Sequence, residues 1–234
     1  MKPQVGFTLV EIAIVLVVIG LLLGGVLKGQ ELVLNAQIRN SINDFNNVAS
    51  ARFAYQDRYR AVPGDDITAF ARWNTAANPV ANGNGDGALT GRWDGSGGTT
   101  PGGANGSPAE ETVTFWHHLR NDNLIAGPRN ASGAGAATFA NPQNSFNGIT
   151  GVQEAAFGAA GGEAMLGDVI CQSAIPARAA VLIDTRMDDG SGANLGANSG
   201  GLMATADLVA GNEVLNPPSA NYGVASRYIM CREL

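Results

Sequence analysis

The N-terminal part of the chain contains a long apolar run that only a membrane or another apolar surface can cover. Residues 7–27 read FTLVEIAIVLVVIGLLLGGVL, with one charged residue, Glu11, and one hydroxyl, on Thr8. As a helix this run is about 31 Å long, which matches the roughly 30 Å hydrocarbon core of a bilayer. The run therefore predicts one membrane-spanning helix near the N-terminus.

Two ordinary explanations of such a run are a cleaved secretory signal and a plain N-terminal anchor. The run is longer than the apolar region of a secretory signal, which has about 7–15 residues, and no good small-x-small cleavage site follows it. A plain anchor with an unpaired or protonated acid leaves Glu11 unexplained, because an acid costs about 2.5–3.5 kcal/mol at mid-membrane and less near the interface. We interpret Glu11 as a functional residue.

Gly6 separates the apolar run from a short polar leader that contains Lys2. Cleavage after Gly6 would create a positively charged amine on Phe7, about one helical turn before Glu11. A pair of unit charges about 4 Å apart is worth ~1 kcal/mol in water and ~4 kcal/mol at an effective dielectric constant near 20. The amine and the carboxylate can pair within one chain or between neighbouring helices, and the second arrangement would set the axial register of an assembly.

The segment from Gly6 to Glu11, GFTLVE, resembles the processing and assembly signature of type IV pilins and of the related pseudopilins of type II secretion systems. The resemblance covers roughly residues 1–60. It implies cleavage after Gly6 by a membrane aspartyl prepilin peptidase and N-methylation of Phe7. It also implies that Glu11 pairs with the N-terminus of an adjacent subunit during filament assembly.

The same resemblance implies the partners and the location of the chain. The partners would be other pilin or pseudopilin subunits, the prepilin peptidase and an inner-membrane assembly platform. The chain would cross the inner membrane once with its head in the periplasm, and would then enter an extracellular pilus or a periplasmic pseudopilus. Lys2 in the leader agrees with a cytoplasmic N-terminus.

The rest of the N-terminal segment has the pattern of an amphipathic helix. Apolar residues recur at steps of three and four at Leu34, Ile38, Ile42, Phe45, Ala49 and Phe53. Pro63-Gly64 ends the pattern. The expected division is a leader at 1–6, a transmembrane or filament-core helix at 7–27, the amphipathic half of the same helix at 28–62, and a globular head at 63–234.

The head is expected to be α+β, with a small antiparallel sheet packed on the long helix. The β-branched and aromatic content favours strands at 168–171 and 224–230. Ser107 and Glu110 have the spacing of a capping box at the start of a helix. The stretches rich in glycine and asparagine at 82–106, 130–162 and 189–201 are expected to be loops.

The two cysteines, Cys171 and Cys231, both fall in the part expected to be exported. An oxidising compartment permits their pairing, and the spacing resembles the C-terminal disulfide loop of many pilins. Two separate buried thiols are the alternative.

A calcium loop is the one metal site that the sequence suggests. Asn82, Asn84 and Asp86 occupy alternating positions before Gly87, as in the first half of an EF-hand loop. The match then fails, because the twelfth position is Trp93 instead of an acid. An ordinary series of Asn-Gly turns explains the same residues, so we expect no cofactor, with calcium as the alternative.

Catalysis and nucleic-acid binding have no support in the sequence. His117 and His118 are adjacent and so point to different faces of a helix, which cannot form the i, i+4 zinc pair. No nucleophile elbow or phosphate-binding loop occurs. The net charge of −6, with no run of basic residues, argues against nucleic acid.

The sequence therefore predicts a structural subunit of a type IV pilus-like filament and no enzyme. A type II secretion pseudopilin is the first alternative, because it shares every processing feature. The second is a surface-binding or adhesin module that uses the helix as a mount and the loops at 82–106 or 130–162 as its contact surface.

Overall fold

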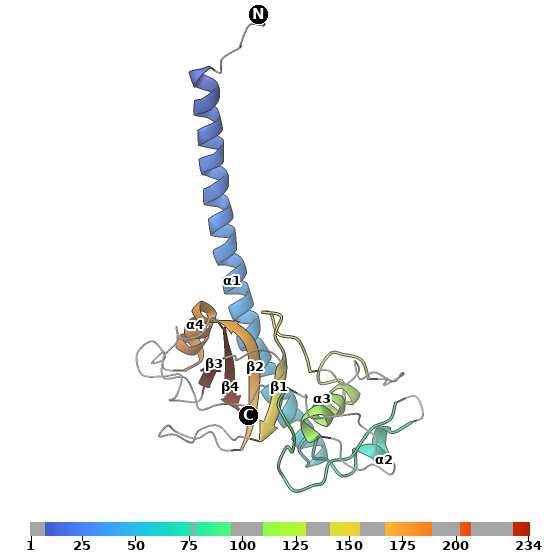
Figure 1. Ribbon diagram of the computed structural model, residues 1–234. Coiled ribbons are helices and arrows are strands. Elements are labelled where there is room, and N and C mark those ends of the chain that lie inside the picture. The colour runs from blue at the N-terminus through green and yellow to red at the C-terminus, as the bar shows by residue number, and fades with distance from the viewer. Residues whose placement is uncertain are drawn as a thin grey trace, which may run out of the picture.

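The computed structural model describes residues 8–75, 78–94, 110–129, 141–154, 167–188, 202–206 and 227–234. Helix α1, Leu9–Tyr59, has 51 residues and is about 77 Å long at 1.5 Å per residue. Its first half projects away from the rest of the molecule, and its second half packs against a head that contains a sheet (Figure 1). The expected α+β class, with a long helix and a small antiparallel sheet, is confirmed.

Helix α1 ends where the backbone turns left-handed. Arg60 has φ 56° and ψ 28°, and its N–H donates to the Gln56 carbonyl at 2.8 Å. Pro63 follows three residues later and disfavours helix in the residue before it. This end agrees with the sequence pattern.

The buried face of α1 differs from the one expected in its C-terminal part. Ile38 and Phe45 are fully buried, but Phe53 is 56% exposed. Since 19 residues turn a helix about 100° past a whole number of turns, the steps of mostly four carry Phe53 off the face that begins at Leu34. The buried face continues instead through Val48, Ala51 and Tyr55.

Within the described residues the sheet has four strands in the order β1-β2-β4-β3, and every pair is antiparallel. The strands are β1, Thr150–Glu154, β2, Asp168–Pro176, β3, Leu202–Ala206, and β4, Arg227–Glu233. Strand β4 lies in the interior of the sheet, between β2 and β3.

The sheet has two covered faces, because alternate residues of a strand point to opposite sides. On the face toward α1, Ile170, Tyr228 and Met230 join the main core. On the other face, Val169, Ile229 and the two cysteines pack with Trp93. Trp93 comes from the loop that follows residue 82, so part of that loop belongs to the core.

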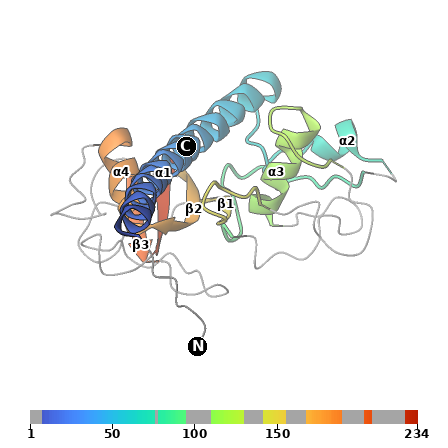
Figure 2. The same ribbon diagram turned by 90° about the horizontal axis from the view of Figure 1, so that it is seen from above.

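In the described part of the head, three short helices flank the sheet and α1. They are α2, Ala69–Trp73, α3, Glu111–Asn121, and α4, Ala177–Met187. Helix α4 lies at one end of the head, and α2 and α3 lie together at the other (Figures 1 and 2). The Arg186 guanidinium of α4 donates to Asn35 Oδ1 of α1 at 3.0 Å.

Residues of α2 anchor the end of α1. The Arg72 guanidinium lies 4.1 Å from the Tyr59 ring centroid and 4.8 Å from that of Trp73, and pairs with the buried Asp66. The Tyr55 hydroxyl donates to Asp66 Oδ2 at 2.7 Å. Burial raises the pKa of Tyr55, so this hydroxyl stays protonated and keeps donating.

The capping box expected from Ser107 and Glu110 at the start of a helix, here α3, is wrong. Glu110 occupies the N-cap position of α3 without a side-chain hydrogen bond, and Ser107 lies outside the described residues. The Thr90 carbonyl accepts from the N–H groups of Glu111 at 2.9 Å and Thr112 at 3.4 Å. A contact distant in the sequence therefore replaces the expected capping box.

Two strands were not expected. Strand β1 falls inside the stretch at 130–162 that was interpreted as a loop, and β3 follows the stretch at 189–201. The other two strands match the expected positions, but β2 extends to Pro176 and β4 extends to Glu233. Residues 224–226 lie outside the described residues.

Candidate functional site

The first turn of α1 contains the acid that the sequence marks as functional. Thr8 is the N-cap residue, and the Glu11 N–H donates to its hydroxyl oxygen at 3.3 Å. Glu11 Oε2 accepts from both the N–H and the hydroxyl of Thr8, each at 3.0 Å. Gly6 and Phe7 lie outside the described residues, so the predicted cleavage and pairing stay predictions.

None of the described residues covers the apolar half of α1. Large apolar side chains from Leu9 to Val33 are between 46% and 86% exposed. Among the described residues, α1 is the one helix long and apolar enough to cross a membrane, and none of its most apolar segment is buried. An apolar surface of this size requires lipid or other helices.

Comparison with known protein families identifies this segment. Residues 1–27 match the family model described as the prokaryotic N-terminal methylation motif. The chain carries the type IV pilin and pseudopilin signature. Neither a curated protein nor a solved structure matches it.

The pilin signature has general consequences for this pilin-like chain. Proteins with the signature are structural rather than catalytic, are processed by prepilin peptidase and assemble with other pilin subunits. The signature and the exposed apolar helix together indicate membrane anchoring.

The disulfide predicted for the head is present. Cys171 and Cys231 are directly opposite each other on β2 and β4, with their Cα atoms 4.1 Å apart. The bond ties the C-terminal strand to its neighbour and packs beneath Trp93. The bond adds a covalent link to the backbone pairing of β2 with β4, and β3 pairs with β4 in turn.

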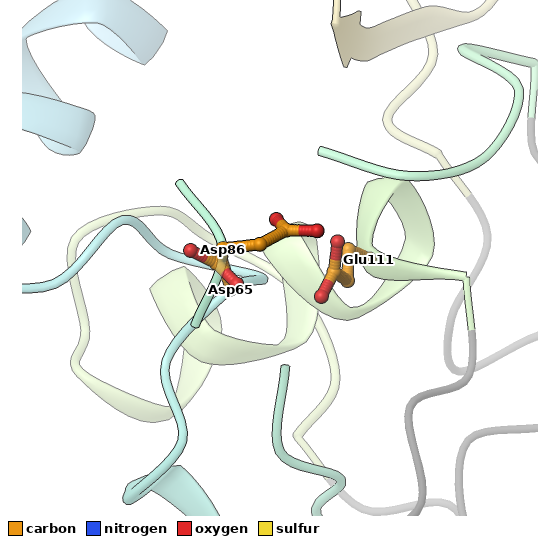
Figure 3. Close-up of side chains that lie close together, drawn as sticks. All are labelled: Asp65, Asp86 and Glu111. Carbon is orange, nitrogen blue, oxygen red and sulfur yellow. The ribbon is translucent and has the colours of Figure 1, made fainter. Parts of the chain in front are cut away.

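A cluster of three carboxylates lies beside the suspected calcium loop. Asp65, Asp86 and Glu111 place one oxygen each within 4.8 Å of one another, and Figure 3 shows the three side chains turned toward a common space. Asp65 and Glu111 are buried, whereas Asp86 is exposed. In the part of the chain that the structure describes, this is the one group of three acids, histidines or cysteines that converges in this way.

Backbone N–H groups of the loop surround the two buried carboxylates. Asp65 accepts from the N–H groups of Gly85 and, at 2.8 Å, Gly87. Glu111 accepts from Asn84 N–H at 2.8 Å and from Thr90 N–H at 2.9 Å. These hydrogen bonds tie the backbone of the loop to Asp65 and Glu111.

Two of the three residues predicted as calcium ligands, Asn82 and Asn84, make hydrogen bonds within the head. Asn82 Oδ1 accepts from the Phe70 N–H at 2.7 Å, and Asn84 Nδ2 donates to Asp86 at 2.8 Å. Of the three, Asp86 alone belongs to the converging carboxylates, where Asp65 and Glu111 are its neighbours. No local motif joins Asp65 and Glu111 to the loop, so sequence reasoning missed them. Calcium binding stays a prediction.

The two histidines lie on different faces of α3, as expected. His118 Nδ1 accepts from the Gly64 N–H at 2.9 Å, and its Nε2 lies 2.9 Å from the Ala81 carbonyl, so Nε2 carries the proton. Burial lowers the pKa of His118 to about 4 and lowers that of His117 as well. Neither histidine belongs to the converging acid cluster described above.

Proposed function

We propose that this chain is a structural subunit of a type IV pilus-like filament. Prepilin peptidase would cleave it after Gly6, Phe7 would be N-methylated, and the subunit would assemble through α1. The observation that carries the proposal is the methylation motif on an apolar helix that is fully exposed in its first half and continuous with the core of the head.

The exposed half of α1 would serve the subunit both in the membrane before assembly and in the filament afterwards. Before assembly, the apolar segment would span the inner membrane, with the head in the periplasm. On assembly, the same side chains would pack against neighbouring helices, because the apolar surface must stay out of water in both states. The inner-membrane assembly platform and other pilins would be the partners in this transfer.

Glu11 would direct the register between subunits. In the present structure its carboxylate bonds to Thr8 of the same chain. After cleavage, the free amine of Phe7 in an adjacent subunit would offer a charged partner instead. An ion pair in the low dielectric of a filament core is stronger than the same pair in water, so mispaired registers would be disfavoured.

The described part of the first glycine-rich loop contributes to the core of the head. Leu89 and Trp93 are 1% exposed, and the backbone of the loop wraps Asp65 and Glu111. Residues 84–87 are exposed, so the surface-binding module stays an alternative. A pseudopilin of a type II secretion system remains the second candidate, because the methylation motif is common to both classes.

Shearing of surface filaments tests the proposal. The tagged full chain is produced in a host with its cognate assembly genes, and the sheared fraction is probed by immunoblot. We expect processed chain in the sheared filaments, and unprocessed chain confined to the membrane in a strain without prepilin peptidase. Processed chain that is absent from sheared filaments and copurifies with a secretion complex would favour the pseudopilin.

A further inference from the structure

A pocket of about 600 Å³ opens beside the packed half of α1, away from the membrane segment and the carboxylate cluster. Helix α1 contributes a face with small side chains, including Ala51 and Ala54. Leu124 and Ile125, after α3, and Trp116 supply apolar surface. Pockets that bind small molecules in proteins have volumes of about 300–1,000 Å³ and largely apolar walls.

Two polar groups of the pocket have no partner among the described residues. Asp44 is half-buried, makes no hydrogen bond or ion pair with any described residue, and has its pKa raised by burial. It is the one charged residue among the described residues that line the pocket. The Trp116 side chain is fully buried, and its indole N–H has no acceptor. A ligand could therefore supply a cation for Asp44 and an oxygen for Trp116.

We propose that this pocket binds a small molecule that carries a cationic amine and an oxygen acceptor on an apolar body. The amine pairs with Asp44, the oxygen accepts from the Trp116 indole N–H, and the body packs on Leu124, Ile125 and the small residues of α1. This role is separate from filament assembly and does not depend on it.

The indole signals of the full chain in detergent micelles provide the test. The chain has three tryptophans, and Trp116→Phe assigns the relevant signal in a spectrum of chain labelled with ¹⁵N in its indoles. Tyramine, which has an ammonium group and a phenol oxygen, is titrated at neutral pH. Tyrosol, which has a hydroxyl in place of the amine, is the matched neutral probe.

We expect tyramine to shift the Trp116 signal at millimolar concentration, with smaller effects on Trp73 and Trp93. Asp44→Asn should weaken tyramine binding by about tenfold or more and make the two probes equal, because the charge pair is lost. Asp57→Asn is the matched control, since Asp57 lies on α1 outside the pocket. It should change nothing.

Filling the pocket provides an independent variant. Ala54 is exposed and lines the pocket, so Ala54→Leu should abolish the shift without disturbing the core. Ala36→Leu, on an exposed part of α1 outside the pocket, should leave the shift intact. Circular dichroism and melting of each variant confirm that the fold is retained.

Three outcomes would overturn the proposal. They are an unmoved Trp116 signal with tyramine, equal affinities for tyramine and tyrosol, and an unchanged affinity in Asp44→Asn. A lysine-containing peptide is titrated in parallel. If it binds about tenfold more tightly than tyramine, the cation belongs to a protein partner and the small-molecule assignment is wrong.

Discussion

The carboxylate of Glu11 accepts hydrogen bonds from both the backbone N–H and the hydroxyl of Thr8, each at 3.0 Å. Glu11 therefore completes a capping box at the start of α1, in addition to the assembly role proposed for its charge. The two roles make different demands on the side chain. A cap needs an acceptor oxygen, whereas a pair with an amine needs a negative charge.

Glu11→Gln separates these roles, because glutamine keeps the acceptor and loses the charge. We expect Glu11→Gln and Glu11→Val to lower the fraction of chain in sheared filaments equally, by about tenfold or more, since both remove the ion pair. Thr8→Val, which removes the capping hydroxyl, should have a much smaller effect. Membrane insertion, measured by fractionation, should be normal in all three. Normal assembly of Glu11→Gln would show that capping, and not charge, is what assembly requires.

The disulfide should contribute substantially to the stability of the head. Cys171 and Cys231 are 60 residues apart, and closing a loop of that length stabilises a fold by about 4 kcal/mol in the chain-entropy model. We expect a reducing agent to lower the melting temperature of the full chain. The double variant Cys171→Ser/Cys231→Ser should melt at the same temperature as the wild type in reducing agent. The reducing agent should not change the melting temperature of this variant. Equal melting of oxidised and reduced wild type would contradict this prediction.

His118 should make the fold sensitive to mild acid. Burial lowers its pKa from 6.5 to about 4, so the unfolded chain takes up a proton at a higher pH than the folded chain. The stabilisation is fully present above pH 6.5 and is lost as the pH falls toward 4, with a total of about 3 kcal/mol.

The pH dependence is tested with His118→Gln, because glutamine can still accept from Gly64 and donate to Ala81. Melting temperatures of both proteins are recorded from pH 7.5 to pH 4. The wild type should lose more stability than the variant between pH 6.5 and pH 4. His117, whose pKa is also lowered by burial, stays in both proteins and cancels in the comparison. Parallel curves would contradict the assignment.

The carboxylate cluster predicts different effects for its buried and exposed members. Asp65→Asn should destabilise the head by about 1–3 kcal/mol, because an amide cannot accept both loop N–H groups. Asp86→Asn should have little effect in EDTA, since Asp86 is exposed.

The same variants test calcium. If calcium occupies the cluster, millimolar calcium chloride raises the melting temperature of the wild type and not that of Asp86→Asn. Identical melting of the wild type in calcium and in EDTA would end the calcium prediction.

The features that sequence reasoning predicted depend on local patterns. The apolar run of membrane length, the GFTLVE segment and the break at Pro63-Gly64 are each a pattern within one short segment of the sequence. The end of helix α1 at Arg60 and the exposed apolar half of α1 follow from them directly. The disulfide followed from the presence of two cysteines and the pilin resemblance.

The features that were missed depend on contacts between distant residues. Gly151 makes strand β1 look like a loop, but a Cβ there would lie 1.7 Å from the Trp93 carbonyl oxygen, so only glycine permits the approach. The Thr90 carbonyl caps α3 by accepting from the N–H of Glu111, which is 21 residues away in the sequence. The Thr90 hydroxyl also donates to the Glu111 carboxylate. Asp65 and Glu111 likewise accept hydrogen bonds from loop residues that are distant from them in the sequence. Such contacts between distant residues leave no periodicity or short motif in the sequence.

The N-terminus of the mature chain is the decisive test of processing after Gly6. The protein is purified from cells with active prepilin peptidase and examined by intact-mass and N-terminal peptide mass spectrometry. We predict a chain that begins at Phe7 and carries one N-methyl group on that residue. A working protein that still begins at Met1 would contradict it.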